Sequence, residues 1–137
     1  MYKHIMVPVD LAHADRLDRA LTTAADLAKH YGIPLTYVGV TATTPGAVAH
    51  NPEEFQAKLD RFAQAQGLKH GLRPDMVAYT SHDPAVDLDQ TLMKAIDETQ
   101  ADLVVMASHV PGLADHLFAS NAGHLAMHAK ISVFVVR

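Results

Sequence analysis

Polar residues follow two strongly apolar runs of the sequence and are the first candidates for a binding site. Asp10 ends the run 5–10, and Ser108 and His109 follow the run 103–107. Such short apolar runs between helical patterns are typical of buried parallel strands, and ligands bind beyond the carboxyl ends of those strands, where the winding reverses. The sequence therefore predicts a crevice lined by Pro8, Val9 and Asp10 on one side and by Ala107, Ser108, His109 and Val110 on the other.

The start of the last predicted helix points into the same crevice, at Ala119, Ser120 and Asn121. The first turn of a helix has unpaired N–H groups and the positive end of the helix dipole, so it can bind an anion. Simpler interpretations remain open. Asp10 can cap the following helix, Ser120 and Asn121 can be ordinary helix caps, and His109 can lie on a surface loop.

Most familiar catalytic motifs are missing from the sequence. It contains no P-loop, no glycine-rich dinucleotide motif after the first apolar run and no nucleophile elbow. Residues 81–83 (Ser-His-Asp) supply only a fragment of a receiver-domain acidic cluster. His124 and His128 have the i,i+4 spacing that can hold zinc, but they lack a third ligand of clear spacing. We therefore predict surface or interface histidines, no metal site and no catalytic residue.

Short apolar runs alternate with helical periodicity along the whole chain. Strands are predicted at 5–10, 35–40, 76–80, 103–107 and 131–136, and helices at 14–31, 52–68, 85–99 and 117–129. Gly32 is a suitable residue to end the first helix, and Asn51 with Pro52 is a suitable start for the second. This alternation predicts one Rossmann-like α/β domain over residues 1–137, with a parallel sheet and helices on both faces.

Composition narrows the class of protein further. The 137 residues carry a formal charge of −4 and no tryptophan, which argues against nucleic-acid binding. The absence of cysteine excludes a disulfide framework. No stretch approaches the roughly 20 apolar residues that span a membrane, and the first residues show no signal-peptide cleavage pattern. We therefore expect a cytoplasmic protein that contacts neither nucleic acid nor a membrane.

Several segments resemble the universal stress protein family, in the family's order. They are the opening Met1–Asp10, the turn at 81–85, the run 101–109 and the closing 131–137. The resemblance covers the whole chain, and Ala107-Ser108-His109 with Ser120-Asn121-Ala122 is similar to the F-type branch. It implies a five-stranded parallel sheet in the order 3-2-1-4-5, which agrees with the predicted elements.

The resemblance also implies a site for ATP. In many members an aspartate ending the first strand and a valine ending the second contact the adenosine, and these positions are Asp10 and Val40. A loop of pattern Gly-x2-Gly-x9-Gly-Ser/Thr holds the phosphates. In that register Ala107, Val110 and Ser120 replace the three glycines and Asn121 replaces the Ser/Thr; a loop shorter by one residue aligns Ala119-Ser120 with the Gly-Ser pair. Val110 is β-branched and disfavours the positive φ that glycine allows.

The function implied by the resemblance is a stress-response protein that binds or senses, through ATP or another adenine nucleotide. A nucleotide-independent dimeric interaction module is the alternative, and a slow ATP hydrolase is a weaker one. Family dimers commonly pair through the last strand, and residues 133–136 are apolar and uncharged there. An apolar edge strand usually needs a cover, so we expect a homodimer through this strand that acts on protein partners not identified by the sequence.

Overall fold

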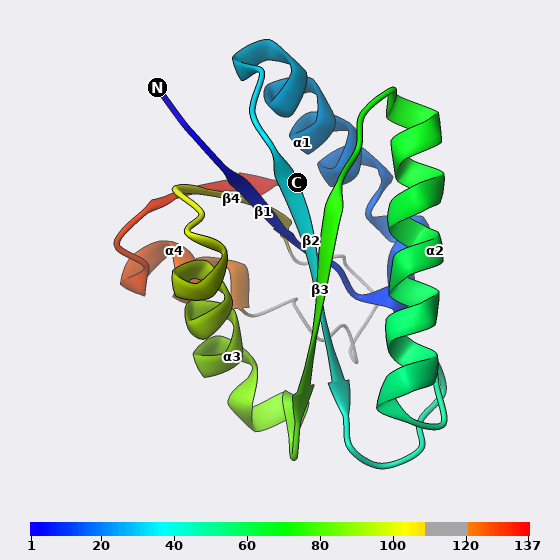
Figure 1. The fold of residues 1–137 in the computed structure, drawn as a ribbon. Helices are drawn as coiled ribbons and strands as arrows, with labels where there is room; N and C mark the ends of the chain where they lie inside the picture. Colours follow the sequence, from blue (N-terminus) through cyan, green and yellow to red (C-terminus); the bar gives the residue numbers. More distant parts are fainter. Residues whose placement is uncertain (109–120) are drawn as a thin grey trace.

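Five parallel strands form one sheet in the computed structural model, which describes residues 1–108 and 121–137. They are β1 (Ile5–Pro8), β2 (Leu35–Ala42), β3 (Asp75–Ser81), β4 (Leu103–Ala107) and β5 (Ser132–Val136), in the order β3-β2-β1-β4-β5. Figure 1 shows the chain winding outward from β1 to β3 and then returning past β1 to β4 and β5. The expected strand order is therefore confirmed, and the winding reverses between β1 and β4.

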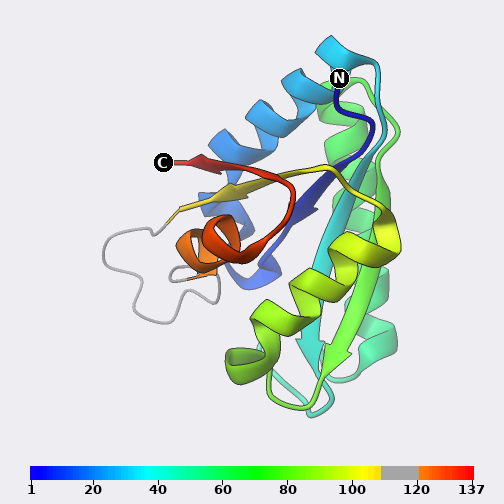
Figure 2. The same cartoon turned by 90° about the vertical axis from the view of Figure 1, so that its left-hand side faces the viewer.

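Helices cover both faces of the sheet, as Figures 1 and 2 show. Helices α1 (Asp18–Tyr31) and α2 (Pro52–His70) pack on one face, and α3 (Pro84–Thr99) and α4 (Asn121–His128) pack on the other. Each face has its own apolar core. Leu21 and Leu59 are buried in the first core, and Leu92 and Leu125 are buried in the second. Among the described residues, none of the helices combines the length and apolar character needed to cross a membrane.

Local sequence signals account for where α1 ends and where α2 begins. The Asn51 side chain accepts a hydrogen bond from the Glu54 N–H at 2.8 Å, and Pro52 occupies the first turn of α2. Gly32 ends α1 with φ of 63°, a left-handed conformation that glycine adopts without a steric penalty. These two boundaries agree with the sequence prediction.

The segment after β1 differs from its prediction. The periodicity predicted one helix from residue 14, whereas the chain forms a short 3-10 helix, η1 (Leu11–Arg16), and α1 begins only at Asp18. The cause is Asp10, which caps η1 by accepting a hydrogen bond from the Ala12 N–H. Such a cap starts the helical turn directly after the strand.

Strand β1 is fastened at its start by Asp102, the residue just before β4. The Asp102 carboxylate accepts hydrogen bonds from the backbone N–H groups of Lys3 and His4 at 2.9 to 3.0 Å. Burial by itself would raise the pKa of Asp102, but these N–H donors outweigh it and hold that pKa below its usual value. The first and fourth strands are therefore held in register by one side chain.

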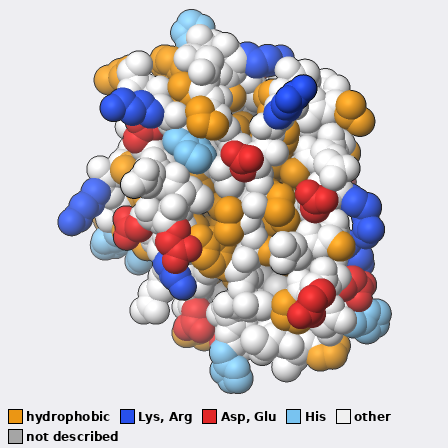
Figure 3. All heavy atoms as spheres, viewed as in Figure 1, with side chains coloured by type: hydrophobic (Ala, Val, Ile, Leu, Met, Phe, Trp, Pro, Cys, Tyr) orange, Lys and Arg blue, Asp and Glu red, His pale blue; other side chains and the backbone are white. Residues whose placement is uncertain are grey.

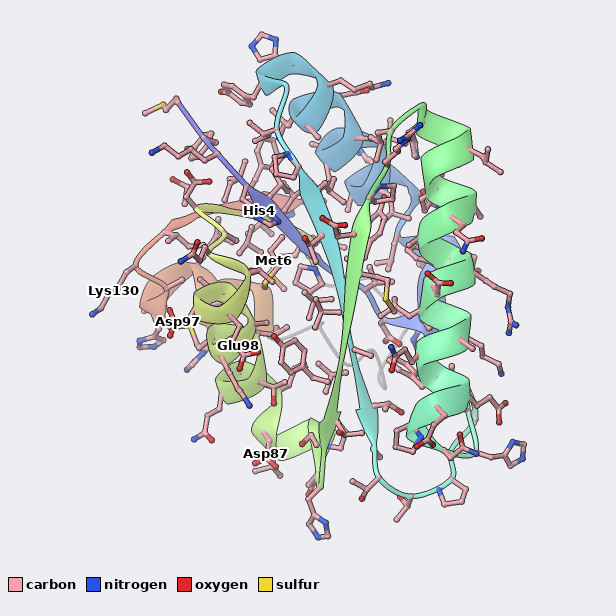
Figure 4. The ribbon with its side chains drawn as sticks, in the orientation of Figure 1. His4, Met6, Asp87, Asp97, Glu98 and Lys130 are labelled. Atoms are coloured by element: carbon pink, nitrogen blue, oxygen red, sulfur yellow. The ribbon has the colours of Figure 1, made fainter. Side chains whose placement is uncertain are left out.

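Edge strand β3 is tied to α3 near both ends of the helix. The Ser81 hydroxyl donates to the Asp87 carboxylate at 3.1 Å, and the Tyr79 hydroxyl donates to Glu98 at 2.8 Å. Figure 4 shows Asp87 at the start of α3 and Glu98 toward its end.

The surface of the molecule in the view of Figure 1 is drawn in Figure 3. Apolar side chains gather along its middle, with charged side chains around them.

Candidate functional site

A hollow of about 260 Å³ lies beyond the carboxyl ends of β1 and β2. It is lined by Asp10 after β1, by Val40 in β2 and by residues 11–13 of η1. The segment 41–49 closes another side, where a turn is held by the Gly46 N–H donating to the Ala49 carbonyl at 2.9 Å. This is the edge of the sheet at which doubly wound α/β proteins bind ligands.

Asp10 is the acidic residue among the described residues that line this hollow. Its side chain is only 9% exposed; one carboxylate oxygen accepts from the Ala12 N–H at 3.1 Å, and the other lies 3.0 Å from His13 Nδ1. A buried carboxylate needs such partners because its desolvation is costly. A carboxylate has about four acceptor positions, so Asp10 can serve as a cap and still accept a hydrogen bond from a ligand.

The structure brings together only part of the predicted crevice. Asp10 and Val40 line the hollow. Pro8 and Val9 belong to the sheet and the core: Val9 is 1% exposed, and its N–H donates to the Val38 carbonyl at 2.8 Å. Neither of them is among the residues that line the hollow.

The other predicted side of the crevice lies at the border of the described residues. Ala107 pairs with Val136 in the sheet, and the Ser108 N–H donates to the Val136 carbonyl at 2.8 Å, so both continue the β4–β5 ladder. Four predicted site residues lie outside the described residues, namely His109, Val110, Ala119 and Ser120. Asn121 is the first residue of α4. The predicted phosphate loop therefore stays a prediction.

Of the described lining residues, only Asp10 and Val40 were predicted from the sequence, and His13 and Phe55 are the most informative of those that were not. His13 lies three residues after Asp10, and the signal that could have identified it is this Asp-x-x-His spacing on a capped turn. Phe55 enters the site from the first turns of α2, with 44 residues of chain between it and Asp10. No local pattern connects such distant residues, because their proximity arises from packing.

The two histidines of α4 contact each other, and His124 also contacts α3. His124 Nδ1 lies 3.0 Å from an Asp89 carboxylate oxygen, and the His124 and His128 ring centroids are 4.3 Å apart. Over residues 1–108 and 121–137, no three histidine or acidic side chains are arranged to hold a metal ion.

The strand order defines a doubly wound α/β protein, and the hollow lies at the carboxyl-terminal edge of its sheet, the edge at which this architecture binds ligands. Residues 1–137 match the model of the universal stress protein family, and the chain belongs to this family. Universal stress protein G of Salmonella typhimurium is 30% identical over 148 aligned positions, which cover the whole of both chains. The resemblance predicted from the sequence is therefore confirmed at the level of the family.

Solved structures share the fold of this chain. A universal stress protein from Archaeoglobus fulgidus in complex with dAMP has a TM-score of 0.68 at 22% identity, covering 99% of this chain and 98% of that one. A universal stress protein in complex with cAMP has a TM-score of 0.71 at 21% identity, covering 99% and 97%. At these identities the likeness establishes the fold.

Proposed function

We propose that this protein is a stress-response binding protein that holds an adenine nucleotide in the hollow beyond β1 and β2 and acts through protein partners. The observation that carries the proposal is the buried carboxylate of Asp10, which lines a hollow beyond the carboxyl ends of β1 and β2. Two structures of the same fold are described as complexes with dAMP and cAMP, which supports the choice of ligand class.

Each lining residue has a role that follows from its chemistry. Asp10 accepts hydrogen bonds from ligand hydroxyl or amino groups, and η1 fixes its position through the Ala12 N–H. Val40 and Phe55 supply apolar contact area for a flat base, as aliphatic and aromatic side chains do in most small-molecule sites. Binding needs no chemical step from these residues.

Replacing Asp10 with asparagine should weaken binding without unfolding the site. Asparagine caps a helix about as well as aspartate does, so η1 should persist while the charged acceptor is lost. Hydrogen bonds to charged groups contribute about 1.5–3 kcal/mol, so we expect the Kd for adenosine to rise at least about tenfold. Calorimetric titration of nucleotide-stripped protein measures this change.

The matched control is Asp15→Asn, which changes an exposed aspartate of the same short helix and should leave the Kd within about twofold. An unchanged Kd for Asp10→Asn would show that the carboxylate does not contact the ligand. If wild-type protein gives no heat with adenosine, AMP or ATP up to millimolar concentration, the nucleotide-independent interaction module becomes the better description.

We further propose that β5 forms a homodimer interface. It is an edge strand without charged residues, and Phe134 remains 46% exposed at its centre. Such an edge offers both unpaired backbone groups and apolar area to a second copy. Val133 and Val135 pack against the core formed with α3 and α4, so Phe134 is the better residue for a test.

Phe134→Lys should convert the dimer to a monomer in analytical ultracentrifugation, because a charge would then be buried at the symmetric contact. Leu68→Lys is the matched control. Leu68 is 88% exposed on α2, a helix that packs near β3 at the opposite edge of the sheet, so its replacement should leave the dimer intact. A dimer that survives Phe134→Lys would mean that the interface does not include β5. The face in front of the other edge strand, β3, would then be the next candidate (Figure 3).

A further inference from the structure

A second hollow, which we call the outer hollow, lies on the surface between η1, the segment 47–48 and α2. It has a volume of about 610 Å³, within the range of about 300–1,000 Å³ that pockets for small organic ligands usually occupy. Figure 1 shows the segment that follows β1 running beside α2 in this region. The outer hollow is therefore large enough to take a small molecule of its own.

The wall of the outer hollow is mainly apolar. Leu11 comes from η1, Val48 from the segment before α2, and Phe62 from α2 itself. These three side chains pack against the core on one side of the sheet and still remain partly exposed. The Phe62 ring is held by an edge-to-face contact with the buried ring of Tyr37, with the ring centroids 5.3 Å apart. A preformed apolar wall of this kind favours a ligand with an apolar body.

Two cationic side chains of α2, Lys58 and Arg61, complete the described lining of the outer hollow. They are three residues apart, so they lie on one side of the helix. The Lys58 ammonium group donates to the Val48 carbonyl and lies 3.4 Å from a Glu54 carboxylate oxygen. Arg61 is exposed, and no carboxylate in the described part of the chain forms an ion pair with it. Its guanidinium offers a planar fork of donors that matches a carboxylate.

The balance of charge at the outer hollow favours a ligand with a single negative charge. Glu54 offsets Lys58, its ion-pair partner. Asp60 lines a different hollow and accepts a hydrogen bond from Gln64 at 3.0 Å. Among the described lining residues and their ion-pair partners, Arg61 is therefore the charge that is not offset. A monoanion with an apolar body matches both the charge and the wall.

We propose that the outer hollow binds a small organic acid, with the apolar body on Leu11, Val48 and Phe62 and the carboxylate at Arg61. The site adjoins the hollow at Asp10 through Leu11 and Val48, which line both. It is nevertheless a separate site, because Phe62 and Arg61 are not among the described residues that line the hollow at Asp10. The inference does not rest on the proposed function.

The test compares octanoate with n-octanol, because the two ligands have the same carbon chain and differ in the carboxylate. We expect wild-type protein to bind octanoate about tenfold more tightly than octanol at low salt, through charge-assisted hydrogen bonds. Arg61→Ala should remove most of this preference and leave the Kd for octanol within about twofold. Arg61→Lys, which keeps the charge but loses the planar fork, should retain part of the preference. Calorimetric titration at about 50 mM and about 500 mM salt should show that only octanoate binding weakens at high salt.

Two further variants locate the site. Ala14 is a half-buried residue of η1 that lines the outer hollow and not the hollow at Asp10. Ala14→Leu should therefore fill the space and weaken octanoate and octanol alike. Arg19→Ala is the matched control for Arg61→Ala, since Arg19 is an exposed arginine of α1 that lines neither hollow. It should leave both Kd values unchanged, and circular dichroism should show that each variant is folded.

Equal affinity for the two ligands, or a preference for octanoate that survives Arg61→Ala, would show that Arg61 does not bind the carboxylate and would overturn the inference. It would also be overturned if neither ligand gave heat up to millimolar concentration, or if a folded Ala14→Leu variant bound both as tightly as the wild type. None of these results would affect the proposed function, which the titration with adenosine tests separately.

Discussion

Replacing Leu92 with alanine should lower the free energy of unfolding by about 3 kcal/mol. Leu92 lies on the inner side of α3, is fully buried, and belongs to the core that also contains Met6 and Val104 from the central strands. Truncation removes the transfer free energy of the lost methyl groups and leaves a cavity, because neighbouring strands cannot move inward by much. Urea denaturation followed by circular dichroism measures the change.

The same helix provides a control for this experiment. Val86 is 75% exposed near the start of α3, so Val86→Ala deletes apolar atoms that are already in contact with water. Its effect on the free energy of unfolding should stay within about 0.5 kcal/mol. Similar losses for both variants would mean that α3 does not pack on the sheet through Leu92.

Gly67→Ala should also destabilise the protein, by about 2 kcal/mol, although alanine is the better helix former. A β-carbon at this position would lie 2.7 Å from the Leu72 carbonyl oxygen and 3.0 Å from Pro74 Cδ. The backbone cannot yield easily there, because the Gly67 carbonyl accepts hydrogen bonds from the N–H groups of Gly71 and Leu72 that end the helix. The chain after α2 would have to move outward. Urea denaturation again measures the change.

Gly123→Ala tests the opposite expectation on α4. A β-carbon there meets no described atom within 4 Å, so helix propensity should dominate and stability should rise by up to about 1 kcal/mol. Opposite signs for the two glycine variants would confirm that the turn after α2 imposes glycine at 67. A stabilising Gly67→Ala would contradict the close approach of Leu72.

The elements of this fold could be predicted from the sequence because their signals are local. The run at 103–107 and the capped start of α2 at Asn51 are encoded by neighbouring residues, and the family resemblance supplied the strand order. The helical turn at Leu11–Arg16 was missed, because apolar periodicity does not distinguish a 3-10 turn capped by Asp10 from the first turn of a longer helix.

The candidate site could be predicted only in part, for a physical reason. Asp10 and Val40 end or nearly end adjacent strands, so topology alone places them together. Phe55 belongs to a helix whose inner face is recognisable from its pattern, but the part of that face that borders the hollow depends on how α2 crosses the sheet.

The bond between Asp102 and the first residues of the chain has a consequence for biosynthesis. The partners are 98 and 99 positions apart, so β1 emerges from the ribosome long before β4 can pair with it. At about 5–20 residues per second this interval lasts roughly 5–20 s. During that time β1 and β2 can pair, but the other edge of β1 stays open to pairing with a foreign strand. Strand β1, which is central in the finished sheet, is thus an edge strand for most of the time during which the chain is synthesised.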